Sequence, residues 1–184
     1  MKYAFFPGCV LESAGGASHV QDIAPEITLA TNARNIALAE EKGLNLLTVC
    51  NTCTLMLREA KNELDNNEKE KEEVNKKLAQ IGKQYRGTTD ITHFLWVLIR
   101  DYGLDKLKEK VVKPLTGLRV AEYYGCHILR PQTEMGFEDY QMPTSLADLI
   151  SAIGATPIDF SRKLDCCGFH AVYPAHDSVM QMTG

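Results

Sequence analysis

Short apolar runs alternate with amphipathic stretches in the first third of the chain, and this alternation predicts strands followed by helices. The aromatic-rich run 2–6 favours a strand, and apolar residues at helical spacing over 28–42 favour a helix that ends at Gly43. A second apolar run, 44–49, has the pattern of a buried strand, and the stretch 52–64 has helical spacing. Such alternation is typical of α/β folds with short parallel sheets.

The middle of the chain is rich in charged residues. The stretch 62–77 is a dense mixture of Glu, Lys and Asn, which indicates a solvated, exposed helix or, as the alternative, a contact for a partner protein. We expect a further helix over 89–101, capped by its first residues, with Phe94 on the buried side and Trp96 partly exposed on another face. A short helix is expected to follow and to end near 112.

The second half of the chain opens as the first does. The run 118–123 favours a strand, the stretch 144–153 an amphipathic helix, and 156–160 a second strand. Residues 6–11 and 123–129 also share a pattern, because each ends a strand and delivers a cysteine after a glycine. The two halves are therefore predicted to be related by an internal repeat.

The composition excludes several classes of protein. With 184 residues, 45% of them hydrophobic and 24% charged, the chain can bury a core. No apolar run approaches the ~18 residues of a membrane span, and the N-terminal run does not have the pattern of a signal peptide. The formal net charge of −4 argues against nucleic acid as the main partner. We therefore expect a cytoplasmic protein without a membrane span.

Cysteine content is the unusual feature of this composition. The six cysteines are Cys9, Cys50, Cys53, Cys126, Cys166 and Cys167. Cys50 and Cys53 form a C-x-x-C pair at the predicted junction of a strand and a helix, where backbone N–H groups favour thiolate. The last two cysteines are adjacent and precede a glycine. In a cytoplasmic chain, clustered cysteines indicate metal or redox chemistry more often than disulfides.

Thiolates are soft ligands that suit both zinc and iron–sulfur clusters. Zinc sites usually draw four ligands from two local pairs, and this chain has a single C-x-x-C, so it fits that pattern poorly. Two adjacent cysteines cannot easily place both sulfurs on one tetrahedral metal, but they can bridge neighbouring metals of a cluster. The residues therefore favour iron–sulfur clusters. Zinc at one site, buried free cysteines and a thioredoxin-like dithiol at Cys50 and Cys53 are the alternatives.

Two histidines are candidate catalytic residues because of their position next to cysteines. His127 follows Cys126, and His170 lies three residues after Cys167. Either imidazole could donate a hydrogen bond to a cluster sulfur or supply a proton near a substrate thiolate. A lone histidine is more often a satisfied core or surface residue, which is the alternative for both and the expectation for His93.

Short motifs around the cysteines are distinctive in both halves of the chain. In the first half they are Phe6-Pro7-Gly8-Cys9, Ala33-Arg34-Asn35 and Cys50-Asn51-Thr52-Cys53. In the second half they are Tyr124-Gly125-Cys126-His127, Pro143-Thr144-Ser145-Leu146 and Arg162-Lys163-Leu164-Asp165-Cys166-Cys167-Gly168. Together they resemble the cysteine-rich CCG domain found in the B subunit of heterodisulfide reductase. The resemblance covers nearly the whole chain, and the gap from Cys126 to Cys166 matches the family spacing.

The resemblance implies two pseudo-symmetric α/β CCG subdomains, each with a short parallel sheet flanked by helices. They would span residues 1–60 and 116–184, joined by a helical connector at 61–115. Each subdomain of the family has the pattern C…CC-Gly…C-x-x-C and can hold a noncubane [4Fe–4S] cluster. The ligands here would be Cys9, Cys50 and Cys53 for one cluster and Cys126, Cys166 and Cys167 for the other.

The resemblance also implies an activity and partners. The B subunits of CoB–CoM-type heterodisulfide reductases reduce or form a disulfide at these clusters, with a disulfide or thiol as substrate. Electrons come from a ferredoxin-like C subunit together with a flavin-containing A subunit. We therefore expect an oxidoreductase acting on sulfur groups. The alternatives are an electron-transfer subunit of a quinone-linked dehydrogenase, or a structural protein that binds metal without catalysis.

Two departures from the family pattern concern the cluster ligands. Ala14 and Gly15 stand where the first CC is expected before Gly16, and the stretch between Cys9 and this point is tens of residues short of the family pattern. The final C-x-x-C is absent, because the sequence ends at Gly184. The sequence is either that of a shortened paralogue or one from which segments are left out. We favour omission because both losses fall on cluster-binding loops.

Overall fold

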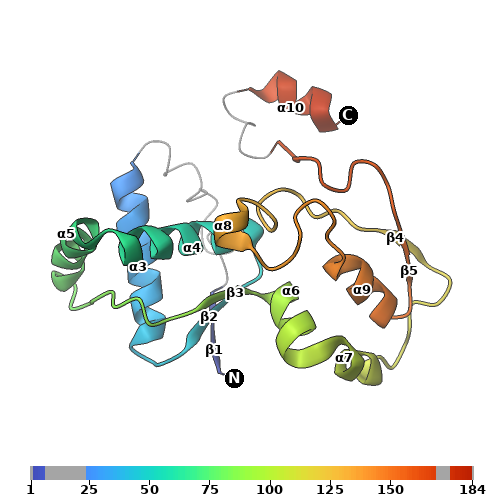
Figure 1. The fold of residues 1–184 in the computed structure, drawn as a ribbon, viewed down its shortest axis with the longest axis horizontal. Coiled ribbons are helices and arrows are strands. Elements are labelled where there is room, and N and C mark those ends of the chain that lie inside the picture. The colour runs from blue at the N-terminus through green and yellow to red at the C-terminus, as the bar shows by residue number, and fades with distance from the viewer. Residues whose placement is uncertain (1, 7–23, 169–174, 184) are drawn as a thin grey trace. The chain divides into compact units, whose positions relative to one another are not determined.

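The computed structural model describes residues 2–6, 24–168 and 175–183 of the chain. The chain forms two compact units, Met1–Phe94 and Leu95–Gly184. Figure 1 shows the helices and strands of both units with the labels used here.

The first unit is built on a three-stranded parallel sheet in the order β1-β2-β3. Its elements are β1 (Tyr3–Phe6), α3 (Pro25–Glu40), β2 (Asn45–Thr48), α4 (Asn51–Asn66), α5 (Glu68–Ala79) and β3 (Ile91–His93). Ala4, Leu46 and Ile91 stand in register across the sheet and contribute to the core. The same core takes side chains from α3, α4 and α5, so these helices cover the face of the sheet on which the three residues lie.

Local sequence determines where these helices begin and end. Pro25 opens α3, where its missing N–H is no loss, and the chain turns after the helix at Gly43, whose φ of +60° favours glycine. Cys50 caps α4, and Asn67 separates α4 from α5 and caps the latter by accepting a hydrogen bond from its first turn. The strands and helices predicted over 2–64 are confirmed, each within a few residues.

The charged stretch 62–77 belongs to two helices and is not uniformly exposed. Leu64 on α4 and Val74 and Leu78 on α5 are buried in the core of the first unit. The prediction of a solvated, exposed helix is therefore wrong for one face of this segment. A few apolar positions among many charges are enough to give each helix a stripe of apolar side chains that faces the core, while Glu and Lys cover its other faces.

The largest difference from the prediction lies at 89–101, where the sequence predicts one capped helix. The structure instead has β3, followed by α6 (Phe94–Trp96), the π-helical segment η1 (Val97–Gly103) and α7 (Leu104–Lys110). β3 forms because it pairs with β2, and the N–H of Leu46 donates to the carbonyl of Asp90 at 2.8 Å. This pairing is a long-range contact that overrides the local helical pattern.

The two aromatic residues of α6 also differ from the expectation. Phe94 is 44% exposed, although we expected it on the buried side, and Trp96 is only 3% exposed, although we expected it to be partly exposed. The Trp96 ring stacks on Phe137, with 5.3 Å between the ring centroids. Because Phe137 comes from a distant loop, the spacing of apolar residues within the helix could not indicate this burial.

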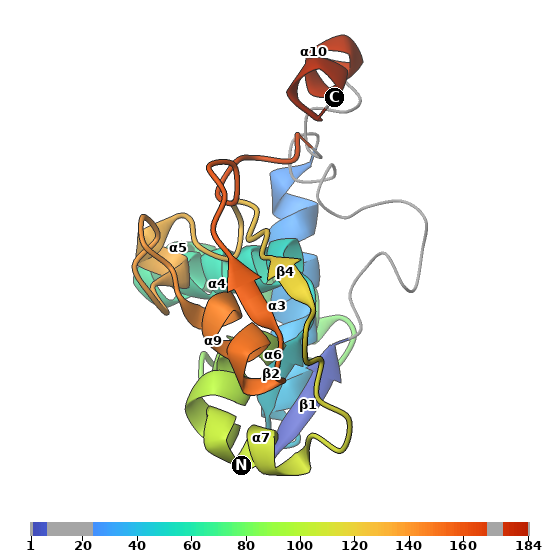
Figure 2. The ribbon, with the colours of Figure 1, turned by 90° about the vertical axis from the view of Figure 1, so that its right-hand side faces the viewer.

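The second unit has a two-stranded parallel sheet in which Arg119 pairs with Thr156. Its strands and remaining helices are β4 (Arg119–Ala121), α8 (Gln132–Met135), α9 (Ser145–Ala152), β5 (Thr156–Ile158) and α10 (His176–Thr183). Figure 2 shows β4 beside β5, with α9 next to them. α9 packs against both β5 and α7.

Short parallel strands flanked by helices occur in both units, which confirms the predicted α/β fold class. The segment 61–115, predicted to be a helical connector, is divided between the units. Its α5 and β3 belong to the first unit, and its η1 and α7 belong to the second. The assignment of CCG subdomains to 1–60 and 116–184 stays a prediction.

Candidate functional site

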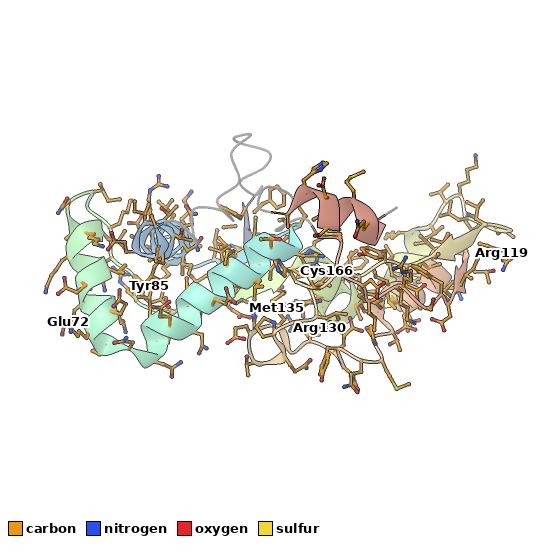
Figure 3. The ribbon with its side chains drawn as sticks, turned by 90° about the horizontal axis from the view of Figure 1, so that it is seen from above. Glu72, Tyr85, Arg119, Arg130, Met135 and Cys166 are labelled. Carbon is orange, nitrogen blue, oxygen red and sulfur yellow. The ribbon has the colours of Figure 1, made fainter. Side chains whose placement is uncertain are left out.

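Two cysteine-bearing loops of the second unit follow β4 and β5. Because the carboxyl ends of parallel strands meet at the same edge of a sheet, these loops can bring distant cysteines together. The Sγ atoms of Cys126 and Cys166 lie 3.8 Å apart, although 40 positions separate the residues in the sequence. Both are free thiols; Cys166, labelled in Figure 3, is exposed, and Cys126 is half-buried.

This distance fits two ligands of one metal ion. Two thiolates bound at about 2.3 Å to a tetrahedral metal lie about 3.8 Å apart, whereas the sulfurs of a disulfide are about 2.0 Å apart. The thiols of Cys126 and Cys166 therefore have the spacing that one tetrahedral iron or zinc centre requires. Thiolates are also the usual protein ligands of iron–sulfur clusters, so this donor pair suits such a cluster.

The turn after the vicinal pair requires glycine. The N–H of Gly168 donates to the Sγ of Cys166 at 3.4 Å, and Cys167 between them is exposed. Gly168 has a φ of +73°, and a Cβ added there would lie 2.9 Å from a methyl carbon of Val179 in α10. Both the backbone conformation and the packing of α10 therefore disfavour a side chain at this position.

Gly168→Ala is expected to destabilise the second unit more than Gly117→Ala does. Both glycines have a positive φ, but an added Cβ at Gly117 would meet nothing within 4 Å. Each change costs about 1 kcal/mol for the left-handed backbone, and Gly168→Ala costs roughly 1 kcal/mol more because Val179 must move. Denaturant unfolding of both variants measures the difference, and equal losses would show that α10 does not pack on this turn.

Tyr124 joins the first cysteine loop to α9. Its N–H donates to the carbonyl of Lys163 at 3.0 Å, and its phenol oxygen accepts the N–H of Leu146, in the first turn of α9, at 2.8 Å. The ring is buried, and this burial raises the pKa of the phenol. Glu138 occupies the same helix end, because its carboxylate accepts the N–H groups of Thr144 and Ser145. The loop before Cys126 is therefore fixed to a capped helix.

Tyr123 points out of the same loop and is 46% exposed. Its phenol donates to the carbonyl of Asp165, directly before Cys166, at 2.6 Å. Partial desolvation, followed by the negative charges of the nearby Cys167 and Cys166, raises the pKa of this phenol. Tyr123 therefore lies near the cysteines and stays protonated as a hydrogen-bond donor at neutral pH.

An ion pair between a buried carboxylate and a half-buried lysine lies at the carboxyl end of β4. Glu122 is buried, and one of its carboxylate oxygens lies 3.6 Å from the Nζ of Lys163. Lys163 also contacts Asp159 at 2.7 Å, and that hydrogen bond raises the pKa of the Lys163 ammonium. Lys163 therefore remains charged and ties the segment before the vicinal cysteines to the end of β4.

The C-x-x-C pair of the first unit lies at the junction of β2 and α4, as predicted. The Sγ of Cys50 accepts the N–H of Cys53 at 3.4 Å and caps the helix. A hydrogen bond from the Cys53 side chain, helped by backbone N–H groups of Cys53 and Thr52, lowers the pKa of Cys50 to about 6, although burial acts in the opposite direction. Cys50 is therefore prepared to act as a thiolate ligand.

Buried threonine hydroxyls hold this junction in place. Thr54 donates to the carbonyl of Cys50 at 3.0 Å, and its hydroxyl is hydrogen-bonded to that of Thr48 at the end of β2. Both threonines are fully buried. The backbone of the C-x-x-C turn is therefore tied to the sheet from inside the unit.

The predicted ligands and catalytic residues are only partly accounted for. Cys9, His170 and the stretch around Ala14 lie outside the described residues. Within the described ranges, no group of three or more Cys, His, Asp or Glu side chains is arranged to hold a metal ion. His127 is half-buried beside Cys126, and its catalytic role stays a prediction. Buried His93 has a pKa lowered by burial.

Sequence reasoning did not single out Tyr123, Glu138 or Lys163 as residues that shape the site. Tyr123 lies within the repeated segment 123–129, and Lys163 lies within the motif that ends in Gly168, so both had a signal in the sequence. Glu138 had none, because its contact with the first turn of α9 depends on the path of the intervening loop.

Comparison with known proteins identifies the family. The profile of the CCG cysteine-rich domain matches residues 12–58 and 120–183. The chain is 41% identical to a protein of Archaeoglobus profundus described as similar to the heterodisulfide reductase B subunit, over 78% of this chain and 48% of the relative. It is 44% identical to the 8-methylmenaquinol:fumarate reductase membrane anchor subunit of Wolinella succinogenes, over 99% of this chain and 72% of the relative. The chain belongs to the CCG cysteine-rich family.

The lengths of these relatives differ from that of this chain. The chain spans about half the length of the heterodisulfide reductase relatives that it matches. The alignment with the Wolinella protein extends over 209 positions against 184 residues here, so at least 25 positions of that relative have no counterpart in this chain.

A solved structure supports the fold. The crystal structure of a hypothetical protein from Helicobacter pylori matches 88% of this chain, and the match covers 28% of the Helicobacter chain. The TM-score is 0.59 and the sequence identity is 18%. This likeness concerns the fold alone. Among the described residues, no helix has the length and apolar character needed to cross a bilayer.

Proposed function

We propose that the chain is an iron–sulfur subunit of an oxidoreductase complex and carries electrons through a cluster in its second unit. The observation that supports this most directly is the 3.8 Å separation of Cys126 and Cys166 within a match to the CCG domain. Cys126, Cys166 and Cys167 would hold a noncubane [4Fe–4S] cluster, which when bound accepts and donates single electrons.

The residues of this chain have three tasks in such a site. Cysteine thiolates bind iron, and the N–H of Gly168 stabilises negative charge on Cys166. Tyr124 and Lys163 orient the two loops that carry the ligands. The exposed position of Cys166 and Cys167 leaves this edge of the site open to a substrate or an electron partner.

A second cluster is proposed for the first unit. Cys50 and Cys53, together with Cys9, would be its ligands, and the lowered pKa of Cys50 favours the thiolate that a metal needs. Zinc at this one site is the alternative. His127 and His170 are proposed to supply protons near the second site.

The first specific function that we propose for this subunit is the reduction or formation of a disulfide. It would make the chain the B-type catalytic subunit of a heterodisulfide reductase-like complex, acting in the cytoplasm with a ferredoxin-like C subunit together with a flavin-containing A subunit. It is supported by relatives named as heterodisulfide reductase B subunits, at 39% identity over 76% of this chain for two Methanosarcina proteins.

Electron transfer in a quinone-linked complex is the second candidate. It is supported by the Wolinella relative, which is named for a menaquinol:fumarate reductase and matches this chain over almost its whole length at 44% identity. In that case the cluster would relay electrons between a quinol and a partner protein, and no disulfide would be needed.

The two candidates differ in what reoxidises the cluster. The complex should be isolated anaerobically through this chain, reduced with dithionite and mixed with a CoB–CoM heterodisulfide or with a soluble menaquinone analogue. Rapid reoxidation by the disulfide alone supports the reductase, and rapid reoxidation by the quinone alone supports the relay. Bound zinc without sulfide would contradict both and leave a structural role.

A further inference from the structure

Hydrogen bonds join the two cysteine loops of the second unit at two neighbouring tyrosines. The N–H of Tyr124 donates to the carbonyl of Lys163, and the phenol of Tyr123 donates to the carbonyl of Asp165. The N–H and the carboxylate of Asp165 make local contacts instead, because both contact Arg162. The Tyr123 phenol is therefore a side-chain contact that reaches from the loop of one cysteine to the backbone beside the other.

The acceptor in this bond is well placed to orient Cys166. The carbonyl of Asp165 and the nitrogen of Cys166 belong to one planar peptide unit, so fixing the oxygen fixes the direction in which the chain enters Cys166. Tyr123 itself belongs to the other loop, three residues before Cys126. One side chain therefore links the segments that lead into both cysteines.

We propose that Tyr123 is a positioning residue that holds the thiols of Cys126 and Cys166 at the spacing of two ligands of one metal centre. Its 46% exposure shows that the ring is not required to fill the core. The inference rests on the proposed function for what the thiols bind, but their positions can be tested without any metal.

The test measures how readily the two thiols join in the cluster-free protein. Full-length protein is stripped of metal, reduced and treated with diamide, which takes up the two electrons and two protons released when two thiols form a disulfide. Peptide mass spectrometry then gives the rate of formation of the Cys126–Cys166 bond. Because Tyr123→Phe lacks one hydrogen bond, we expect its rate of disulfide formation to be about fivefold lower than that of the wild type. Tyr123→Leu also lacks the ring, so its rate should be lower still.

Tyr140→Phe is the matched control, because Tyr140 lies in the same unit and its hydroxyl accepts a hydrogen bond from the neighbouring Gln141. This control should cross-link at the wild-type rate. Thermal unfolding of each variant is recorded as well. If a variant has wild-type stability but forms the Cys126–Cys166 disulfide slowly, the slower rate comes from a changed arrangement of the two loops. A wild-type rate in Tyr123→Phe and Tyr123→Leu would overturn the inference.

A second readout uses the metal-loaded protein. Tyr123→Phe is expected to keep its iron but to show changed cluster g-values and a shifted midpoint potential, whereas Tyr140→Phe shows neither change. Unaltered g-values and potential in Tyr123→Phe would count against the inference. If even the wild-type protein binds no iron, the proposed function fails, and the cross-linking rates still decide the role of Tyr123.

Discussion

Replacing Cys166 with serine is expected to abolish the cluster of the second unit. A serine hydroxyl is a poor ligand for iron at neutral pH, and it breaks the pair whose sulfurs lie 3.8 Å apart in the wild-type structure. Iron content should fall by about four atoms per chain, together with the corresponding sulfide and visible absorbance. The fold should survive, because Cys166 is exposed and contributes little to the core.

Two further variants show which site is affected. Ser161→Ala changes an exposed residue of the same loop and should retain all of its iron. Cys50→Ser should lose only the iron of the first unit, so the two cysteine variants should have different residual spectra. Wild-type iron content and an unchanged spectrum in Cys166→Ser would show that the vicinal pair is not a ligand.

Replacing Glu40 with alanine is expected to destabilise the first unit, because it removes the acceptor of two hydrogen bonds. Glu40, only 7% exposed at the end of α3, accepts the N–H groups of Arg86 and Thr88 at 2.8 and 2.7 Å. These bonds hold the segment that leads into β3. Removing a charged acceptor of two hydrogen bonds costs about 3 kcal/mol. Denaturant unfolding, monitored by circular dichroism, measures this loss.

Two further variants test whether the loss of stability comes from the two hydrogen bonds that Glu40 accepts. Glu40→Gln keeps one oxygen acceptor and should lose about half as much stability. Glu41→Ala removes the adjacent carboxylate, whose partner is the surface residue Lys83, and should change stability by less than about 1 kcal/mol. A loss in Glu40→Ala no greater than that in Glu41→Ala would mean that the 84–90 segment is held by other contacts.

Features encoded in short stretches of sequence could be predicted. The apolar run 44–49 followed by a helical pattern placed Cys50 and Cys53 at a strand-to-helix junction, and the structure confirms it. The resemblance to the CCG domain implied that Cys126 and Cys166 are ligands of one cluster, and their Sγ atoms lie 3.8 Å apart. Local pattern was sufficient for the first feature, and the second was indicated by short motifs around the cysteines.

Features that depend on distant partners could not be predicted. β3 arises from pairing with β2 and not from its own helical pattern, and Trp96 is buried because Phe137 stacks on it. The contact between Tyr123 and Asp165 likewise joins residues 42 positions apart, so neither residue looks unusual in its own stretch. Such contacts are fixed by the path of the whole chain, which periodicity does not describe.

Iron and acid-labile sulfide analysis of the anaerobically isolated chain decides whether its cysteines hold iron–sulfur clusters. We expect the two elements in equal amounts, with about four atoms of each for every cluster held and about eight of each if both sites are filled. Cys166→Ser should lose the iron and sulfide of one cluster. About one zinc per chain with no sulfide would contradict an iron–sulfur protein.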